Sequence, residues 1–512
     1  MIIRNLRQNI GDTDESLKIK AAKEAKIPLS KVGYFKILKK SVDARKKNDI
    51  HYVVSIEVAI TPPVPEKKEK TEYNYPENPV VIVGSGPSGL FFALKLAREG
   101  FNPIVVERGA DVDKRKEIIN NFYKTKELST STNIQFGEGG AGTFSDGKLN
   151  TGVNSDKKDF ILNEFVSHGA DEEILYSNKP HIGSDVLPGV IKNIRNEIMA
   201  LGGKFLFETD FTDCVIHEGR VKSIELTSIN GDKTKIEPEC LVIAIGHSSR
   251  DTYRMLYKKG VCMEKKDTAV GFRIEHLQKN INEAQYGKNY DKRLPVSDYK
   301  LVSHASERGV FTFCMCPGGF VMPATSEKGH VVTNGMSNFL RDGVNANSAL
   351  VVQVRSSDYG EDTLSGIEYL ENLEKSAFKM GGEDYSAPCQ LLGDYLNGKK
   401  SEKFGKIKPT YPWTRFCDLN KLFPEELNAA MKKAIADMNK RLNGFADNEA
   451  VLTAVETRTS SPVRIVREDE GFAKGIFNLY PVGEVGFAGG IMSSAIDGLT
   501  IAEKLLNKYK KV

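Results

Sequence analysis

The chain has 512 residues, which is more than one hydrophobic core usually organises, so we expect two or three domains. It carries 72 Lys or Arg against 68 Asp or Glu, and the net charge of +4 is too small to indicate nucleic-acid binding by itself. We find no apolar run of roughly 18 residues and no signal-peptide core. Seven scattered cysteines fit a reducing compartment, so we expect a soluble, cytoplasmic protein with no membrane partner.

Residues 1–60 predict a small α+β domain. Its expected elements are a strand at 1–6, a helix at 14–25 and longer strands at 32–42 and 50–60. This stretch is basic, with 13 Lys or Arg against 7 Asp or Glu. Residues 61–79 are rich in proline and charge and lack apolar periodicity, so we expect a linker.

A glycine-rich turn follows the linker, in the stretch VVIVGSGPSGLFFALKLAREGFNPIVVERG that begins at Val80. The apolar run at 80–83 is typical of a strand buried on both faces. Gly84 permits a tight turn, Gly86 lets a phosphate approach the backbone, and Gly89 lets the next helix pack closely on the sheet. A helix predicted from Ser88 to Arg98 would point its N-terminal amides at that phosphate.

An acidic residue completes this pattern. The apolar run at 103–106 predicts a second strand, and Glu107 follows it, 18 residues after Gly89. A carboxylate in this position accepts hydrogen bonds from ribose hydroxyls. The order of strand, glycine turn, helix, strand and acid predicts a dinucleotide site, although it does not separate FAD from NAD.

Three further stretches expose backbone to a ligand. The loop FGEGGAGTFSDGKLN at 136–150 holds five glycines, and its small residues Gly139, Gly140, Ala141 and Gly142 are suited to donating amides. The apolar strand predicted by CLVIAIG ends at Gly246, where the backbone, together with Ala244 just before it, would pass close to a bound group. In LYPVGEVGFAGGIMSSAIDG at 479–498, a buried strand predicted over 476–486 carries Glu484, and glycines then open a helix whose N-terminus suits negative charge.

Together these motifs resemble the FAD-binding flavoproteins of the glutathione-reductase-like superfamily. The chain is more narrowly similar to the bacterial group of FAD-dependent dehydrogenases, or uncharacterised FAD-dependent oxidoreductases. The narrower resemblance rests also on VGFRIEH, FCMCPGGFVMPATSEKGHVVTNGMS and VETRTSSPVRI. It covers essentially the whole chain.

The resemblance implies an α/β fold with a three-layer, Rossmann-like FAD-binding domain. We expect that domain to be discontinuous, at 80–266 and 454–512, with an α+β substrate or cap domain inserted at 267–453. The residues it implies at the cofactor are Gly84, Ser85, Gly86, Pro87, Ser88, Gly89, Glu107, Arg108, Gly139, Gly140, Ala141, Gly142, Phe211, Ala244, Gly246, Gly483, Glu484, Gly489, Gly490, Ile491 and Met492.

Their roles follow the parts of FAD. The first glycine turn would hold the pyrophosphate, Glu107 and Arg108 the adenosine ribose, and Phe211 the adenine. Gly483 and Glu484 would meet the ribityl chain, and residues 489–492 the flavin ring. The superfamily usually has Asp where this chain has Glu484.

Cys314 and Cys316, in FCMCPGG, are candidates near the chemistry. On a regular strand both would face one side. A zinc site needs about four ligands, and only His304 suggests a third, so we predict no metal. A redox dithiol stays open, although the spacing strains a disulfide. We favour two small buried side chains that pack against the cofactor.

Two basic groups have alternative roles. Arg458, with Arg464 nearby, would either clamp an anionic substrate bidentately or pair with a buried acid. His247 would face the cofactor or, as we favour, hydrogen-bond its own loop. Cys316 and Arg458 are the candidate catalytic residues, and the sequence assigns no general acid or base.

The resemblance implies hydride transfer between a small-molecule substrate and non-covalently bound FAD. A flavin monooxygenase, an FAD-dependent RNA-modifying enzyme that uses the basic domain, and a flavin redox sensor remain alternatives. The sequence has no second glycine fingerprint mid-chain, so NAD(P)H as electron donor would visit the flavin cleft only transiently.

Overall fold

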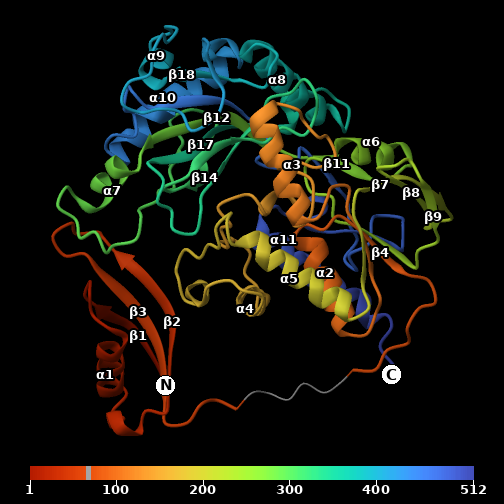
Figure 1. Cartoon of the computed structure of the whole chain (residues 1–512), viewed down its shortest axis with the longest axis horizontal. Coiled ribbons are helices and arrows are strands. Elements are labelled where there is room, and N and C mark those ends of the chain that lie inside the picture. The colour runs from red at the N-terminus through yellow and green to blue at the C-terminus, as the bar shows by residue number, and fades with distance from the viewer. Residues whose placement is uncertain (65–70, 512) are drawn as a thin grey trace.

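The computed structural model describes residues 1–64 and 71–511. The middle of the predicted linker, residues 65–70, lies outside the described residues. Helices and strands alternate around one five-stranded parallel sheet and one larger, mostly antiparallel sheet, so the predicted α/β class is confirmed (Figure 1).

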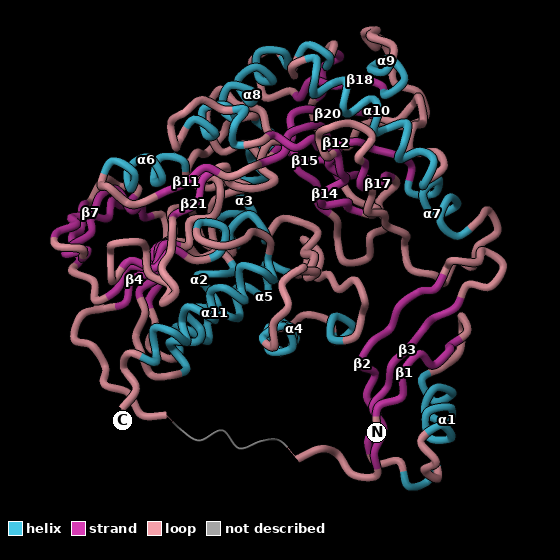
Figure 2. The backbone as a smooth tube through the Cα atoms, turned by 180° about the vertical axis from the view of Figure 1, so that it is seen from behind, coloured by secondary structure: helices cyan, strands magenta, loops and turns pink. Residues whose placement is uncertain are grey.

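The N-terminal segment forms a three-stranded antiparallel sheet in the order β1-β3-β2. Its elements are β1 (Ile2–Gln8), α1 (Asp14–Glu24), η1 (Leu29–Lys31), β2 (Tyr34–Asp43) and β3 (His51–Ala59). Leu17 and Ala21 of α1 pack on Val54, Ile56 and Val58 of β3. Figure 2 shows this sheet beside the rest of the chain. The backbone of Lys40 in β2 is hydrogen-bonded to Tyr176 and Asn178.

The central sheet has the strand order β22-β10-β4-β5-β6, with all of its pairs parallel. Its strands are β4 (Val80–Val83), β5 (Ile104–Val106), β6 (Lys204–Leu206), β10 (Cys240–Ile243) and β22 (Leu479–Pro481). β22 joins β10 after more than 200 intervening residues. The two glycine-rich junctions between strand and helix, one after β4 and one after β22, therefore lie at the same sheet.

Alternation along β4 creates the layers. Val80 and Ile82 belong to the core formed with the helices on one face. Val81 and Val83 pack on the other face, against a separate three-stranded antiparallel sheet at residues 209–236. The helical layer contains α2 (Pro87–Arg98), α3 (Val112–Thr125), α4 (Lys157–Ser167), α5 (Leu187–Ala200) and α11 (Ile491–Asn507). The opposite layer contains β7 (Thr209–His217), β8 (Arg220–Ser228), β9 (Lys233–Ile236) and α6 (Arg250–Lys258).

The second sheet has seven strands in the order β13-β14-β17-β12-β20-β18-β19. They are β12 (Thr268–Leu277), β13 (Val302–Ser303), β14 (Val310–Cys316), β17 (Asn345–Val354), β18 (Ala387–Leu391), β19 (Thr414–Phe416) and β20 (Val451–Glu456). Helices α7 (Gln278–Tyr286), α8 (Ser365–Gly381), α9 (Leu392–Leu396) and α10 (Glu425–Arg441) accompany it. β20 runs across the boundary predicted after residue 453, so the sheet includes the first residues of the returning segment.

The seven-stranded sheet has two unlike faces. Val270, Phe272 and Ile274 of β12 point into the apolar core shared with the helices. Arg273 and Glu275 alternate with them, are fully buried, and lie on the other face. This face carries the polar groups that reach the cavity described below.

Smaller elements complete the structure. They are β11 (Met263–Lys265) paired with β21 (Val463–Ile465), β15 (Phe320–Pro323) paired with β16 (Thr333–Met336), and the 3₁₀ turns η2 (Gly140–Gly142), η3 (Glu172–Leu175), η4 (Ser356–Asp358), η5 (Leu419–Lys421) and η6 (Gly483–Val485). Within residues 1–64 and 71–511, no helix combines the length and apolar character that crossing a membrane requires.

The last strand is shorter than the sequence predicts. The apolar pattern predicts a strand over 476–486, but β22 ends at Pro481. Gly483 has φ +68, a left-handed conformation that stops an extended strand and begins η6.

Candidate active site

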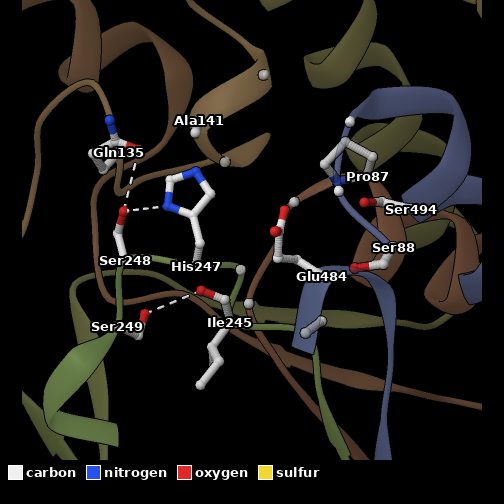
Figure 3. Close-up of a pocket in the computed structure, with 18 of the residues that line it drawn as sticks. Pro87, Ser88, Gln135, Ala141, Ile245, His247, Ser248, Ser249, Glu484 and Ser494 are labelled. Atoms are coloured by element: carbon white, nitrogen blue, oxygen red, sulfur yellow. Dashed lines mark hydrogen bonds between the residues drawn. The ribbon is translucent and has the colours of Figure 1, made fainter. Parts of the chain in front are cut away.

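A cavity of about 660 Å³ is lined by residues of both large sheets. Its wall is made by the turn after β4, the loop at 135–150, the end of β10, parts of β14 and β16, and the start of α11. Its volume falls within the range of roughly 300–1,000 Å³ that is usual for ligand pockets. Figure 3 shows part of the wall, with His247 and Glu484 facing each other.

The three glycines after β4 have different structural reasons. Gly84 has φ +104, and a Cβ there would lie 2.4 Å from the carbonyl oxygen of Ala244. A Cβ on Gly89 would lie 2.0 Å from the carbonyl oxygen of Gly84. A Cβ on Gly86 would meet only the Cα of Gly140, at 3.9 Å, and Gly86 lines the cavity. Gly86 is thus the glycine that leaves room for a ligand rather than for the protein.

Glu107 is buried and organises the surrounding turns. Its Oε2 accepts from the Ser85 amide at 3.0 Å and the Ser85 hydroxyl at 2.6 Å. Its Oε1 accepts from the amides of Gly109 and Gly137, each at 3.0 Å. Donors of the protein therefore occupy the acceptor sites of both oxygens of this carboxylate.

Arg115 of α3 holds the glycine-rich loop from behind, and the sequence analysis missed it. Its guanidinium is fully buried and donates to the carbonyl oxygens of Asn133 (2.9 Å), Ile134 (2.9 Å), Gly137 (3.1 Å) and Glu138 (2.6 Å). Burial lowers the pKa of Arg115 to about 10, so it stays charged at neutral pH. No local signal separates this arginine from a surface charge of an amphipathic helix.

The carboxyl of Glu138 is a second buried group in this loop. Its Oε2 accepts from the Val112 amide at 2.8 Å and from Arg195 at 3.0 Å. Burial raises the pKa of Glu138 to about 7, and these two donors only partly oppose that rise. The folded protein therefore holds a proton on Glu138 that the unfolded chain releases at lower pH.

We predict that Glu138 makes the protein less stable as pH rises from about 5 to 7, with little further change above. Glu138→Gln cannot release this proton, so it should flatten the pH dependence in that window by roughly 1–3 kcal/mol. Urea unfolding at several pH values measures the difference. An unchanged pH profile in Glu138→Gln would show that Glu138 is ionised in the folded protein.

Charged and aromatic groups meet at the end of the cavity nearest β5. The Arg108 guanidinium pairs with Asp210 at 2.6 Å and with Asp251 at 2.7 Å. Its Cζ lies 4.9 Å from the centre of the Phe136 ring, in a cation–π contact. Phe211 lines the same wall. Arg108 is therefore fixed in orientation by the protein.

His247 follows β10 and lines the cavity. Its Nδ1 lies 2.7 Å from the Ser248 hydroxyl, which donates to Oε1 of Gln135 at 3.3 Å (Figure 3). The Gln135 amide nitrogen donates to the Ala324 carbonyl, which fixes Oε1 as an acceptor. The Ser248 hydroxyl thus accepts from His247 Nδ1–H, which leaves Nε2 as an acceptor. Burial lowers the pKa of His247 and keeps the ring neutral.

Glu484 and Asp497 organise the junction between β22 and α11. Glu484 Oε1 accepts from the Ser461 amide at 2.9 Å, and a Cβ on Gly489 would lie 1.9 Å from Glu484 Oε2. Asp497, which the sequence analysis did not single out, accepts from the Gly483 amide at 2.7 Å. Its place within a helix pattern hid it.

Most residues predicted at the cofactor line the cavity. They are Gly84, Gly86, Pro87, Ser88, Glu107, Arg108, Gly140, Ala141, Gly142, Phe211, Ala244, Gly246, Glu484, Gly489, Gly490 and Ile491. Five others lie behind this wall, where they shape it through backbone packing and hydrogen bonds: Ser85, Gly89, Gly139, Gly483 and Met492.

The expectation for the two cysteines needs correction. They do not share one face, because β14 is irregular between Phe313 and Cys316. Cys314 lines the cavity, whereas Cys316 is fully buried and is not part of the lining. The cavity-lining residues that the sequence analysis missed in this region are Lys148, Phe313, Asn334 and Glu456.

Arg458 lines the cavity, but its donors are used within the protein. Nε and Nη2 lie 3.3 and 3.2 Å from the carboxylate of Glu374, and Nη1 lies 2.6 Å from the Ser326 hydroxyl. Arg250 donates to the same carboxylate at 2.7 and 2.9 Å. The structure therefore shows the pair with a buried acid and not the free substrate clamp. Arg464 pairs with Glu264 at the surface.

Two helix N-termini open onto the cavity. α2 begins after Gly86 and α11 after Gly490, and within the described chain no side chain caps either helix. Each end leaves backbone N–H groups and partial positive charge toward the cavity wall. Both glycines line that wall. These residues fit a dinucleotide cofactor with an anionic middle.

Comparison with known proteins agrees with this geometry. Residues 267–459 match the family described as FAD-dependent protein, C-terminal domain-like, and residues 1–59 match a domain of unknown function. An uncharacterised protein of Clostridium beijerinckii is 43% identical across 99% of this chain and 98% of its own length. The chain belongs to this family of FAD-dependent proteins.

More distant likenesses exist among solved structures. A geranylgeranyl bacteriochlorophyll reductase-like protein from Thermoplasma acidophilum is 12% identical, with 84% of this chain and 79% of that chain covered and a TM-score of 0.38. Glycine oxidase from Bacillus cereus is 13% identical, with 85% and 96% covered and a TM-score of 0.32.

Proposed function

We propose that this protein transfers a hydride between a small-molecule substrate and non-covalently bound FAD. The observation that carries the proposal is the pair of uncapped helix N-termini, α2 and α11, at one cavity that also reaches the seven-stranded sheet. FAD, when bound, supplies the two-electron acceptor. Purified protein should therefore be yellow and release FAD on acid treatment. Release of FMN alone, or failure to rebind FAD, would contradict the proposal.

The chain's own residues would hold the cofactor along this cavity. The amides at the start of α2 would bind the pyrophosphate, and Arg108 and Phe211 would border the adenosine. Glu107 would accept from the ribose. Because its other three donors are backbone amides, the ribose hydroxyl would displace the Ser85 hydroxyl, which is free to rotate.

The substrate would lie against the seven-stranded sheet. Lys148, Cys314, Asn334 and Glu456 line this end and offer charge and hydrogen bonds. Burial raises the pKa of Glu456 to about 7, against the effect of Arg273, so its carboxyl is suited to proton transfer near neutral pH. His247 would accept a proton or hydrogen bond at Nε2.

Glu107→Gln should weaken FAD binding by about 1–3 kcal/mol, because the amide group accepts fewer of the hydrogen bonds that converge on Glu107. Fluorescence titration of flavin-free protein with FAD measures the change. Glu208→Gln is the matched control. The Glu208 side chain pairs with Lys114 at 2.8 Å and does not line the cavity, so this change should leave FAD binding unchanged. Wild-type affinity in Glu107→Gln would remove Glu107 from the site.

The electron donor and the compartment are further parts of the proposal. We propose that NADH or NADPH reduces the flavin by transient entry to the cleft, and anaerobic titration with each nucleotide, monitored by flavin bleaching, tests this. Bleaching by neither nucleotide would exclude them as donors. All seven cysteines are free thiols, which supports a reducing compartment such as the cytoplasm.

A further inference from the structure

The backbone at Cys314 is unusual for a strand. β14 pairs with β17, but the register shifts between Phe313 and Cys316, which marks a bulge. Cys314 has φ +43, a left-handed conformation that non-glycine residues rarely adopt. Cys314 lines the cavity, whereas Cys316 is fully buried and does not. The bulge departs from the regular strand geometry in which side chains two residues apart point to the same side.

Two cationic side chains lie beside the Cys316 sulfur. Arg273, which is fully buried, donates from Nη2 to the Cys314 carbonyl at 2.9 Å and lies 3.6 Å from Cys316 Sγ. Lys148 Nζ lies 4.0 Å from Cys316 Sγ. The Cys316 thiol also lies 3.2 Å from the Cys314 carbonyl oxygen. Two positive groups from different parts of the chain thus converge on the Cys316 sulfur, next to Cys314.

The surroundings of the pair favour the loss of one of its two thiol protons. A hydrogen bond from the Cys316 thiol, together with the charges of Lys148 and Arg273, lowers the pKa of Cys314 to about 5, and the same contact raises the pKa of Cys316. Carboxylates balance the cations, since Asp146 pairs with Lys148 at 2.9 Å and Glu456 faces Arg273 at 3.3 Å. The cavity-lining Cys314 therefore has a thiol neighbour, Cys316, which holds its proton more tightly.

We propose that Cys314 and Cys316 form a redox-active dithiol, a second electron-carrying centre at the substrate end of the cavity. This inference rests on the proposed function, because its electron partner is the bound flavin. Oxidation forms the Sγ–Sγ bond between the Cys314 thiolate and the Cys316 thiol. The Cys316 proton and two electrons pass to the oxidised flavin, which becomes the singly protonated reduced anion, so atoms and charge balance.

The test uses the holoprotein, and FAD content is measured first. In anaerobic dithionite titration, the wild type should take up four electrons per chain, two for the flavin and two for the disulfide. Cys314→Ser and Cys316→Ser should take up two. Cys417→Ser, a partly exposed cysteine of the same sheet region, should still take up four. Alkylation after unfolding should find two fewer thiols in oxidised than in reduced wild type.

The outcomes separate this inference from the proposed function. Uptake of two electrons by FAD-loaded wild type, with equal thiol counts in both states, would overturn the dithiol and leave the flavin assignment standing. Protein that binds no FAD would contradict the proposed function. The dithiol would then be tested by oxidised glutathione and peptide mapping, where a Cys314–Cys316 disulfide supports it and separately alkylated thiols overturn it.

Discussion

Gly86→Ala and Gly89→Ala should both weaken FAD binding, but only Gly89→Ala should destabilise the fold. A Cβ on Gly89 would lie 2.0 Å from the Gly84 carbonyl oxygen, and relieving this clash would require the backbone to move. We therefore expect Gly89→Ala to lower the free energy of unfolding by about 1–3 kcal/mol or more. A Cβ on Gly86 would reach open cavity, so stability should stay within about 0.5 kcal/mol while FAD affinity falls about tenfold or more.

Gly189→Ala is the matched control for this pair. A Cβ on Gly189, within α5, would meet nothing within 4 Å, so alanine should leave FAD binding unchanged and stabilise the helix by about 0.5–1 kcal/mol. Urea unfolding of the flavin-free proteins and fluorescence titration with FAD give the two quantities. Wild-type FAD affinity in Gly86→Ala would mean that no phosphate of the cofactor binds against the backbone at Gly86.

Glu374→Gln should be the most destabilising single change in the seven-stranded-sheet region, by about 3–5 kcal/mol. The Glu374 carboxylate is fully buried and accepts from Arg250, Arg458 and, at 2.7 Å, the Thr457 hydroxyl. An amide would leave two buried guanidinium groups without their main counter-charge. Urea unfolding measures the loss. Glu327 lies 2.8 Å from Arg250 and 3.4 Å from Arg458, and a loss below about 1 kcal/mol would show that it compensates.

Glu371→Gln is the control on the same helix. Glu371 pairs with Arg254 at 2.8 Å, with the two side chains 14% and 36% exposed, so its loss should change stability by about 0–1 kcal/mol. Although burial would raise the pKa of Glu374, the charges of Arg250 and Arg458 hold it well below its usual range. The contribution of Glu374 should therefore be fully present above about pH 5 and be lost only as pH falls below the ordinary carboxyl pKa.

The candidate site divides into a part that the sequence predicts and a part that it does not. The turn after β4, the acid Glu107 and the opening of α11 were predicted at their positions. The dithiol environment was not, because Lys148, Arg273 and Glu456 come from three distant segments. The bulge at Cys314 likewise leaves no local signal, so regular alternation placed both cysteines on one face.

Sequence alone determined the α/β class and the glycine turn at one end of the cavity, because strand, glycine turn, helix and acid lie within about 30 contiguous residues, and local sterics and periodicity govern such a unit. Only the tertiary structure decided how β22 returns to β10, which groups Arg458 and Glu107 contact, and which cysteine reaches the cavity. These contacts depend on how two sheets pack and on which buried charges must be paired, and both are set by segments hundreds of residues apart.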